Sequence, residues 1–251
     1  MADIIIAGIL VADIIKLISH YPQKGMLADI SKVTYGIGGC VANTAVSVKK
    51  LDSSINVKSV ALVGKDKQGT FVKKKLSEYG IDISMIQETD CEVTGFTDVM
   101  TIESTGERTF FLNRGANKIF DESNLQIEEE EGSILLGYGG ILDALNKPNE
   151  KYGTDLARAF HDLKEKGLIT AMDVASMKDK EEMQRLVIPS LKYVDYLIVN
   201  EIEAGEITEI EIRKADGMLD RDAMKKAASK IMSMGVQKCC VLHAPEYGCA
   251  L

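Results

Sequence analysis

The sequence is poor in the residues that define several classes of protein. It contains no tryptophan, four prolines and five cysteines among its 251 residues. The cysteines are odd in number and form no CxxC pair, which favours a reducing compartment over a disulfide framework. The three histidines, His20, His161 and His243, do not have the spacing of metal ligands. These absences argue against a disulfide-rich secreted domain and against a zinc module.

Positive charge and long apolar runs are also scarce. The formal net charge is −8, whereas a nucleic-acid-binding protein needs a basic face. No apolar stretch approaches the roughly 20 residues that span a bilayer. The N-terminus lacks the basic leader and the cleavage site of a signal peptide. We therefore expect a cytoplasmic protein with neither a nucleic acid nor a membrane as its partner.

The sequence does contain strands that alternate with helices. The apolar run Ile4–Val11 predicts a strand that is buried on both faces of a parallel sheet. Further strands are predicted over 57–63, 168–174, 195–199 and 236–242, and helices over 40–51, 70–79, 154–166, 181–191 and 221–234. This alternation predicts an α/β fold, a doubly wound, mostly parallel sheet flanked by helices. The length suits one such domain.

Two stretches, at about 14–37 and 94–113, interrupt this alternation. The second reads as a hairpin, with strands at Phe96–Ile102 and Arg108–Leu112 joined by a polar turn that contains glycine. We expect these two insertions to form a small β-sheet that lies across the strand ends as a lid.

The two common nucleotide-binding loops are absent. Gly64-Lys65 is followed by Asp66, where a Walker A loop needs Ser or Thr. The Rossmann pattern fails because Val41 and Leu142 stand where its third glycine is required. A nucleotide bound by this protein would need another kind of site.

Polar residues nevertheless lie near predicted strand ends, where open α/β sheets bind ligands. Asp13 follows the first strand, where its carboxylate either accepts hydrogen bonds from a diol or caps a turn. Gly38 and Gly39 precede a helix that carries Asn43 one turn later. The glycines either allow a ligand to approach the backbone or form a simple turn, and Asn43 binds either a ligand hydroxyl or nearby backbone.

Two later strands end in carboxylates or amides. Asn200 and Glu203 have the spacing of a capping box, and Glu203 could equally hold a water molecule of a hydrated Mg²⁺. Asp173 ends the strand predicted over 168–174, where it either faces the crevice or caps a loop.

Together these segments resemble the ribokinase-like, or PfkB, carbohydrate kinase family. The matching segments are Gly36-Ile-Gly-Gly-Cys-Val-Ala-Asn-Thr-Ala45, Ala61–Thr70 with Glu78–Asp82, Gly106-Glu-Arg-Thr-Phe110 with Gly115-Ala-Asn117, and Asn200-Glu-Ile-Glu203. Their order and spacing hold from residue 4 to 251. No single segment is specific, but the ordered set is.

The resemblance implies a role for each candidate residue on the substrate side. Asp13 and Asn43 would bind hydroxyls of a sugar-like substrate, and the two glycines, Gly38 and Gly39, would pack against it. Asn117 and Arg114 would flank the same pocket.

The resemblance also implies ATP and Mg²⁺ as cofactors. Asp173, Asn200 and Glu203 would order the phosphate and Mg²⁺ region, without a direct protein ligand to the metal. Dependence on a monovalent cation is left open.

One family motif does not occur in these 251 residues. The family carries its catalytic base in a Gly-Ala-Gly-Asp run at a helix N-terminus, where backbone N–H groups would stabilise the phosphoryl charge. The catalytic residue is therefore unassigned, and we expect a ribokinase-like domain over 1–251 that is incomplete at its C-terminal side.

The resulting hypothesis is an ATP-dependent kinase that phosphorylates a hydroxyl of a small sugar. A nucleoside kinase of the same family, a non-catalytic sugar-binding relative and an unrelated α/β enzyme such as a dehydrogenase are the alternatives. Because the predicted lid would have exposed sheet edges, we also expect a homodimer that forms through the lid.

Overall fold

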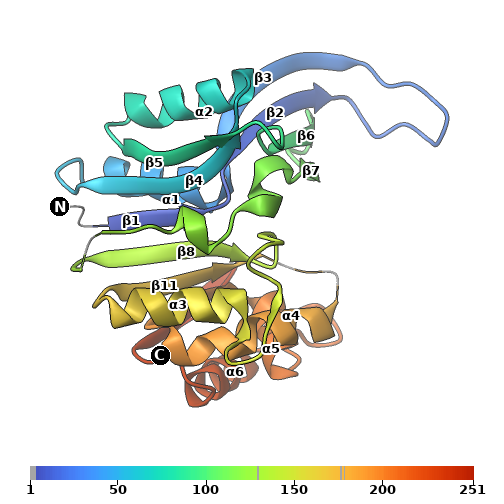
Figure 1. Cartoon of the computed structure of the whole chain (residues 1–251). Coiled ribbons are helices and arrows are strands. Elements are labelled where there is room, and N and C mark those ends of the chain that lie inside the picture. The colour runs from blue at the N-terminus through green and yellow to red at the C-terminus, as the bar shows by residue number, and fades with distance from the viewer. Residues whose placement is uncertain (1–3, 129, 176, 178) are drawn as a thin grey trace.

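A computed structural model describes residues 4–128, 130–175, 177 and 179–251. In this part of the chain, eight strands form the main sheet. All neighbouring strands are parallel except the last two in the sequence, β13 and β14, which are antiparallel. In sheet order the strands are β14 (Tyr247–Ala250), β13 (Cys239–Ala244), β12 (Tyr196–Asn200), β11 (Ile169–Val174), β8 (Ser133–Gly139), β1 (Ile4–Gly8), β4 (Val57–Gly64) and β5 (Asp82–Thr89). The prediction of a mostly parallel α/β sheet is confirmed (Figure 1).

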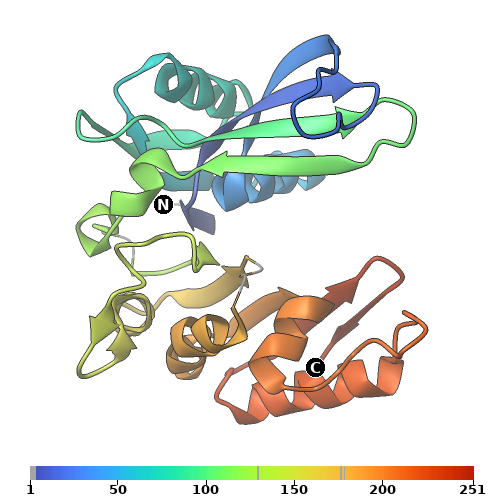
Figure 2. The ribbon, with the colours of Figure 1, turned by 90° about the vertical axis from the view of Figure 1, so that its right-hand side faces the viewer.

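Helices connect these strands and cover the sheet. They are α1 (Gly39–Leu51), α2 (Lys67–Glu78), α3 (Asp155–Glu165), α4 (Lys180–Val187), α5 (Glu201–Thr208) and α6 (Arg221–Ser233), with 3-10 turns η1 (Gly115–Ile119), η2 (Glu122–Asn124) and η3 (Ile188–Tyr193). The connection through α1 leads from β1 towards β4, and the connection through α3 leads from β8 to β11 on the other side. Because such crossovers are right-handed, α1 and α3 lie on opposite faces of the sheet (Figure 2).

The strand order therefore reverses between the neighbouring strands β1 and β8. Such a reversal opens a crevice at the carboxyl ends of the two strands, which is where open α/β sheets bind their ligands. We call this place the switch-point crevice, and it is bounded by the ends of β1 and β8 and by the start of α1.

A second, four-stranded sheet has the order β3 (Ile30–Gly38), β2 (Val11–Ile18), β6 (Phe96–Ile102) and β7 (Arg108–Asn113). We call it the small sheet. The predicted insertions at 14–37 and 94–113 fall on its strands, and its long hairpin β2–β3 projects from the body of the molecule (Figure 1). A short hairpin, β9 (Pro148–Asn149) and β10 (Gly153–Thr154), precedes α3.

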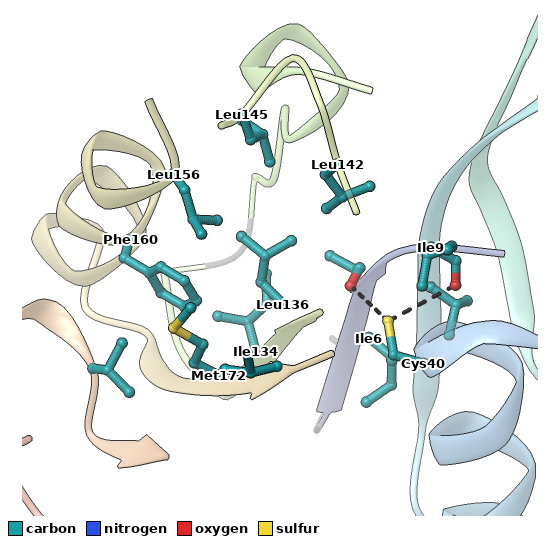
Figure 3. Close-up of a cluster of buried hydrophobic side chains, with 14 of the residues drawn as sticks. Ile6, Ile9, Cys40, Ile134, Leu136, Leu142, Leu145, Leu156, Phe160 and Met172 are labelled. Atoms are coloured by element: carbon teal, nitrogen blue, oxygen red, sulfur yellow. Dashed lines mark hydrogen bonds between the residues drawn. The ribbon is translucent and has the colours of Figure 1, made fainter. Parts of the chain in front are cut away.

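The core lies between the helices and the main sheet. Its side chains include Ile6, Ile134, Leu136, Phe160 and Met172, which are at most 1% exposed (Figure 3). Strands buried on both faces read as continuous apolar runs, which is why β1 and β4 are legible in the sequence.

The prediction of one strand over Ile4–Val11 is wrong. β1 ends at Gly8, and Val11 already belongs to β2 of the small sheet. Gly8 has a φ of +119°, and a Cβ there would lie 1.7 Å from the carbonyl oxygen of Gly137. The chain can therefore leave the main sheet at this glycine, and Asp13 lies within β2 instead of in a turn after β1.

The helix predicted over 181–191 is also shorter than expected. α4 ends at Val187, and the chain continues as the 3-10 turn η3. Pro189 stands at the start of this turn, and proline cannot supply the N–H that would continue an α-helix. The structure also contains β5, β8 and α5, which the sequence pattern did not predict.

Candidate functional site

Two adjacent glycines open α1 at the switch-point crevice, and each is needed for a different contact. A Cβ on Gly38 would lie 2.4 Å from Oδ2 of Asp13. Because glycine has no side chain, the carboxylate of Asp13 can lie directly against the backbone of residue 38. Gly39 has a φ of +83°, and its Cβ would lie 2.3 Å from the carbonyl oxygen of Ile9. α1 begins without a side-chain cap, and in its first turn the N–H of Val41 donates to the carbonyl oxygen of Ile9 at 3.2 Å.

Asp13 is half-buried and is positioned by three strands of the small sheet. It lies opposite Gly36 of β3 and Thr97 of β6. Burial raises the pKa of Asp13, while a hydrogen bond from Thr97 and the positive charge of Arg108 oppose the rise. The small sheet thus places the carboxylate of Asp13 next to the start of α1, together with Thr97 and Arg108, which offset part of the cost of burying its charge.

Asn43 lies one turn into α1 and is exposed. Its side chain hydrogen-bonds Tyr138, which follows Gly137 at the end of β8. This contact opposes the rise of the pKa of the Tyr138 phenol. Burial, the largest influence, still raises the pKa of Tyr138 well above its usual value, so the phenol keeps its proton.

Cys40, in the first turn of α1, packs against β1 and β8 of the main sheet. Its side chain is fully buried, and its thiol lies against the carbonyl oxygens of Ala7, Ile9 and Gly137. Figure 3 shows the contact with Ile9. Burial and the nearby Asp173 raise the pKa of Cys40 above its ordinary range. The thiol is therefore protonated and acts as a packing group, because nucleophilic cysteines have lowered pKa values.

Two carboxylates, those of Asp173 and Glu203, lie near enough to Tyr138 to influence its ionisation. Burial, followed by the charge of Glu203, raises the pKa of Asp173 to about 7, although the backbone N–H of Val174 opposes the rise. Glu203 is 3% exposed. Like charges held this close disfavour each other's ionisation. This side of the crevice therefore carries negative charge that no described cation offsets at Asp173.

Asn200 holds Glu203 in place through a capping box. Oδ1 of Asn200 accepts hydrogen bonds from the N–H groups of Ile202 and Glu203, both at 2.9 Å, and Oε2 of Glu203 accepts the N–H of Asn200 at 2.9 Å. The capping interpretation of this motif is confirmed. The capping role does not exclude a functional role for Glu203, because the capping box fixes the position of the Glu203 carboxylate, whose charge acts on Asp173.

Asn117 and Arg114 bond to other residues of the protein. Asn117 is fully buried, and its amide bonds the backbone of Leu10 in both directions, at 3.0 and 3.1 Å, and the carbonyl oxygen of Arg114 at 2.8 Å. The guanidinium of Arg114 pairs with Asp143. These contacts fix the connection between β1 and β2, and a direct contact of either residue with substrate stays a prediction.

The crevice thus gathers Asp13, Gly38, Gly39 and Asn43 on one side and Asp173, Asn200 and Glu203 on the other. The sequence interpretation missed Thr97, Arg108, Cys40 and Tyr138. A signal for Tyr138 existed, because a lone aromatic residue among glycines follows the apolar run Ile134–Leu136. Its place was missed because β8 was not recognised as a strand.

The donor set limits the metals that the site could hold. No group of three or more His, Cys, Asp or Glu side chains in the described ranges could enclose a metal ion. Asp173 and Glu203 supply two oxygen ligands from neighbouring elements. Mg²⁺ keeps several water molecules and is commonly held by one or two carboxylates. The pair therefore fits a hydrated Mg²⁺ and does not fit a dedicated protein cage.

Within the described residues, no helix is long and apolar enough to cross a membrane.

Comparisons with known proteins match the chain to one family. The model of the pfkB family carbohydrate kinases matches residues 1–250. The ribokinase of Haemophilus influenzae is 24% identical over 232 residues, which are 92% of this chain and 69% of that enzyme. The nucleoside kinase of Methanocaldococcus jannaschii is 30% identical over 124 residues, 49% of this chain and 40% of that enzyme. The structure of Arabidopsis thaliana ribokinase complexed with ribose and ATP superimposes with a TM-score of 0.69 at 21% identity, over 96% of this chain and 72% of that one.

Proposed function

The chain belongs to the pfkB family of carbohydrate kinases, and from this premise we propose that it takes part in phosphoryl transfer from ATP to a hydroxyl of a small sugar or sugar-like compound. One observation carries the proposal. Asp13, Gly38 and Asn43, which we propose bind hydroxyls, lie at the start of α1, and Asn43 contacts Tyr138, whose ionisation Asp173 and Glu203 also influence. A kinase of this family needs both an alcohol and a nucleotide with its cation at one place.

On the alcohol side, Asp13 is suited to accept hydrogen bonds from two neighbouring hydroxyls. The hydrogen bond from Thr97 and the positive charge of Arg108 favour the ionised form of Asp13. An ionised carboxylate accepts hydrogen bonds and does not donate them. Because Gly38 has no side chain, the carboxylate of Asp13 lies directly beside the start of α1. A neutral polyol matches these groups.

On the nucleotide side, Asp173 and Glu203 would hold a hydrated Mg²⁺ through its water molecules, with Asn200 fixing Glu203. Bound there, Mg²⁺ would neutralise charge on the phosphates of ATP. The protein's own part is to place the alcohol and the phosphates in line and to keep water out. The small sheet, which carries Asp13, would close over the substrate and exclude water as a lid.

Two related functions compete with this one. A nucleoside kinase would use the same crevice, because a nucleoside carries the same vicinal hydroxyls, and a nucleoside kinase is among the relatives. A non-catalytic relative would bind the sugar and not turn it over.

The test is a titration of the purified chain by calorimetry with D-ribose, 2-deoxy-D-ribose, D-fructose and adenosine, followed by a coupled assay for ADP formation with ATP and Mg²⁺. We expect one acceptor to bind and to stimulate ADP formation. Binding without ADP formation would support the binding-only relative. Absence of binding by every compound would contradict the proposed function.

We also propose that the small sheet forms a homodimer interface. It exposes large apolar side chains on its outer strands, among them Tyr35 at 67%, Phe110 at 57% and Phe111 at 55%. Such side chains and open strand edges are unfavourable in water and favour pairing with a second copy. Sedimentation at micromolar concentration should show a dimer that Phe111→Ser weakens, and a monomer for the wild type would overturn this part.

A further inference from the structure

A groove of 340 Å³ lies between α5 and the segment that follows this helix, and none of the candidate residues of the switch-point crevice line it. α5 ends at Glu209, whose φ of 59° turns the chain back, so that residues 210–213 return along the helix. Gly205 permits this close approach, because a Cβ there would lie 3.2 Å from the carbonyl oxygen of Ile210. We call this place the α5 groove.

Much of the lining of the α5 groove is apolar. Ile202 on α5 is 57% exposed, whereas Ile210 and Ile212 on the returning segment pack against the core. These side chains offer no hydrogen bonds, so they suit the hydrocarbon portion of a ligand. The volume lies at the lower end of the roughly 300–1,000 Å³ that is typical of small-molecule sites. The groove therefore has the size and the surface for a small, partly apolar compound.

Among the described residues, two cations line the groove, and both are paired. Nζ of Lys180, at the start of α4, lies 2.6 Å from Oε1 of Glu209. Nη2 of Arg213 lies 2.7 Å from Oε1 of Glu201. An anionic ligand would have to break one of these ion pairs, so the groove is poorly suited to bind one.

Glu206 is different, because nothing in the described part of the chain donates a hydrogen bond to its buried Oε2. Burial raises the pKa of Glu206, and no neighbouring cation opposes the rise. Gln184, on the adjacent helix α4 (Figure 1), donates at 2.9 Å to the backbone carbonyl oxygen of Glu206, not to its carboxylate. A buried carboxylate oxygen without a donor is unfavourable, and a ligand with positive charge and N–H groups would relieve this cost.

A metal ion does not meet these requirements. Mg²⁺ and Ca²⁺ take several oxygen ligands, and no group of three or more His, Cys, Asp or Glu side chains in the described ranges could hold a metal. An alkylammonium ion carries three N–H donors for the carboxylate. Its hydrocarbon chain can also cover the exposed side chain of Ile202.

We propose that the α5 groove is a second binding site of the protein, for a small primary alkylamine whose ammonium group bonds Glu206 and whose hydrocarbon chain lies against Ile202 and Ile210. This site does not depend on the proposed kinase function, because neither ATP nor a sugar is needed to fill it.

The experiment is an NMR titration of the chain labelled with ¹³C at its isoleucine methyl groups. The probes are n-hexylammonium, n-butylammonium and the uncharged 1-hexanol. We expect n-hexylammonium to shift the signals of Ile202 and Ile210 saturably, while Ile30, exposed on the small sheet, stays unchanged. n-Butylammonium should bind roughly 3- to 10-fold more weakly, because it buries two fewer methylene groups. 1-Hexanol, which has no charge for Glu206, should bind at least about 10-fold more weakly than n-hexylammonium.

Two variants test the two halves of the site separately. Glu206→Gln keeps the length of the side chain and removes its charge, and the Kd of n-hexylammonium should rise roughly 10- to 100-fold. Ile202→Ser leaves the carboxylate in place and should reduce the difference between the hexyl and butyl compounds. Glu150→Gln, on the exposed turn of the β9–β10 hairpin, is the matched control and should leave every Kd unchanged.

Three results would overturn the proposal. The first is the absence of saturable shifts at Ile202 and Ile210 in wild type. The second is equal affinity for n-hexylammonium and 1-hexanol, which would make the groove an apolar surface without selectivity for charge. The third is an unchanged Kd in Glu206→Gln.

Discussion

The crevice contains two aspartates whose surroundings differ in one respect. Burial raises the pKa of both Asp13 and Asp173. Around Asp13, a hydrogen bond from Thr97 and the charge of Arg108 oppose the rise. Around Asp173, the second influence is Glu203, a like charge that adds to the rise.

We propose that this difference separates a hydroxyl-binding side of the crevice from a cation-binding side. A carboxylate with compensating donors can stay ionised without a ligand and accept bonds from alcohols. A carboxylate beside another one is costly to ionise until a cation arrives. The predictions that follow test whether the two sides differ in this way.

The largest expected effect comes from the two glycines at the start of α1. Gly38→Ala places a methyl group 2.4 Å from the carboxylate of Asp13, which must move. Since φ of Gly38 is −145°, the backbone itself accepts alanine. We expect sugar affinity to fall more than about 100-fold, which is about 2.7 kcal/mol, while the free energy of unfolding changes by less than about 1 kcal/mol.

Gly39→Ala is the matched comparison for that variant. Its methyl group would meet the backbone of Ile9, and its φ of +83° is unfavourable for alanine. Urea unfolding should show a loss of about 2–4 kcal/mol for Gly39→Ala. Equal losses of stability in the two variants would contradict the assignment of Gly38 to the ligand.

Next in size is the pH dependence that Asp173 imposes on stability. Its pKa of about 7 in the folded protein exceeds the model-peptide value of 3.8. The folded state therefore binds more protons between these values, and wild-type stability falls as the pH rises from about 4 to 7. Asp173→Asn removes this cost.

We expect the stability gain of Asp173→Asn over wild type to widen by about 2–3 kcal/mol between pH 5 and pH 8. Urea unfolding at several pH values measures it. Asp29→Asn, on an exposed loop, is the control and should show a constant difference. A gain that is the same at pH 5 and pH 8 would mean that Asp173 does not titrate as described.

A smaller effect should come from Thr97→Val, which removes the bond to Asp13. Without it, the pKa of Asp13 rises further, so acid should abolish sugar binding at a higher pH than in wild type. At pH 7 we expect a loss of roughly 3- to 10-fold in affinity, equivalent to about 1 kcal/mol. Calorimetry across a pH series provides the measurement, and an unchanged acid limb would contradict it.

The smallest effect is expected for Arg108→Met, because this arginine acts on Asp13 through charge. We expect a loss of roughly 2- to 3-fold in sugar affinity that shrinks as salt is added. An effect that does not depend on salt would indicate a direct contact with the ligand instead.

Several strands of the main sheet and the local motifs near their ends could be predicted from the sequence for physical reasons. Buried parallel strands such as β4 are continuous apolar runs, and Gly38-Gly39 before a small-residue helix is a local pattern. Asn200 and Glu203 are legible because a capping box needs a fixed spacing of three residues. These signals are contained in short stretches of the chain.

What the sequence did not reveal depends on contacts between distant segments. β1 ends at Gly8 because the carbonyl of Gly137, far along the chain, occupies the space of a side chain. Tyr138 reaches Asn43 only after β8 has inserted beside β1. The hydrogen bonds between the Asn117 amide and the backbone of Leu10 also join segments that are distant in the sequence, and the contact of Asn117 with substrate stays a prediction.

The most direct test of the account is a calorimetric comparison of wild type with Asp13→Ala, using D-ribose and adenosine. The account predicts that one of the two compounds binds wild type and that its Kd rises roughly 10- to 100-fold in the variant, with the melting temperature nearly unchanged. Equal binding by the two proteins would show that the hydroxyl-binding side of the crevice is placed wrongly.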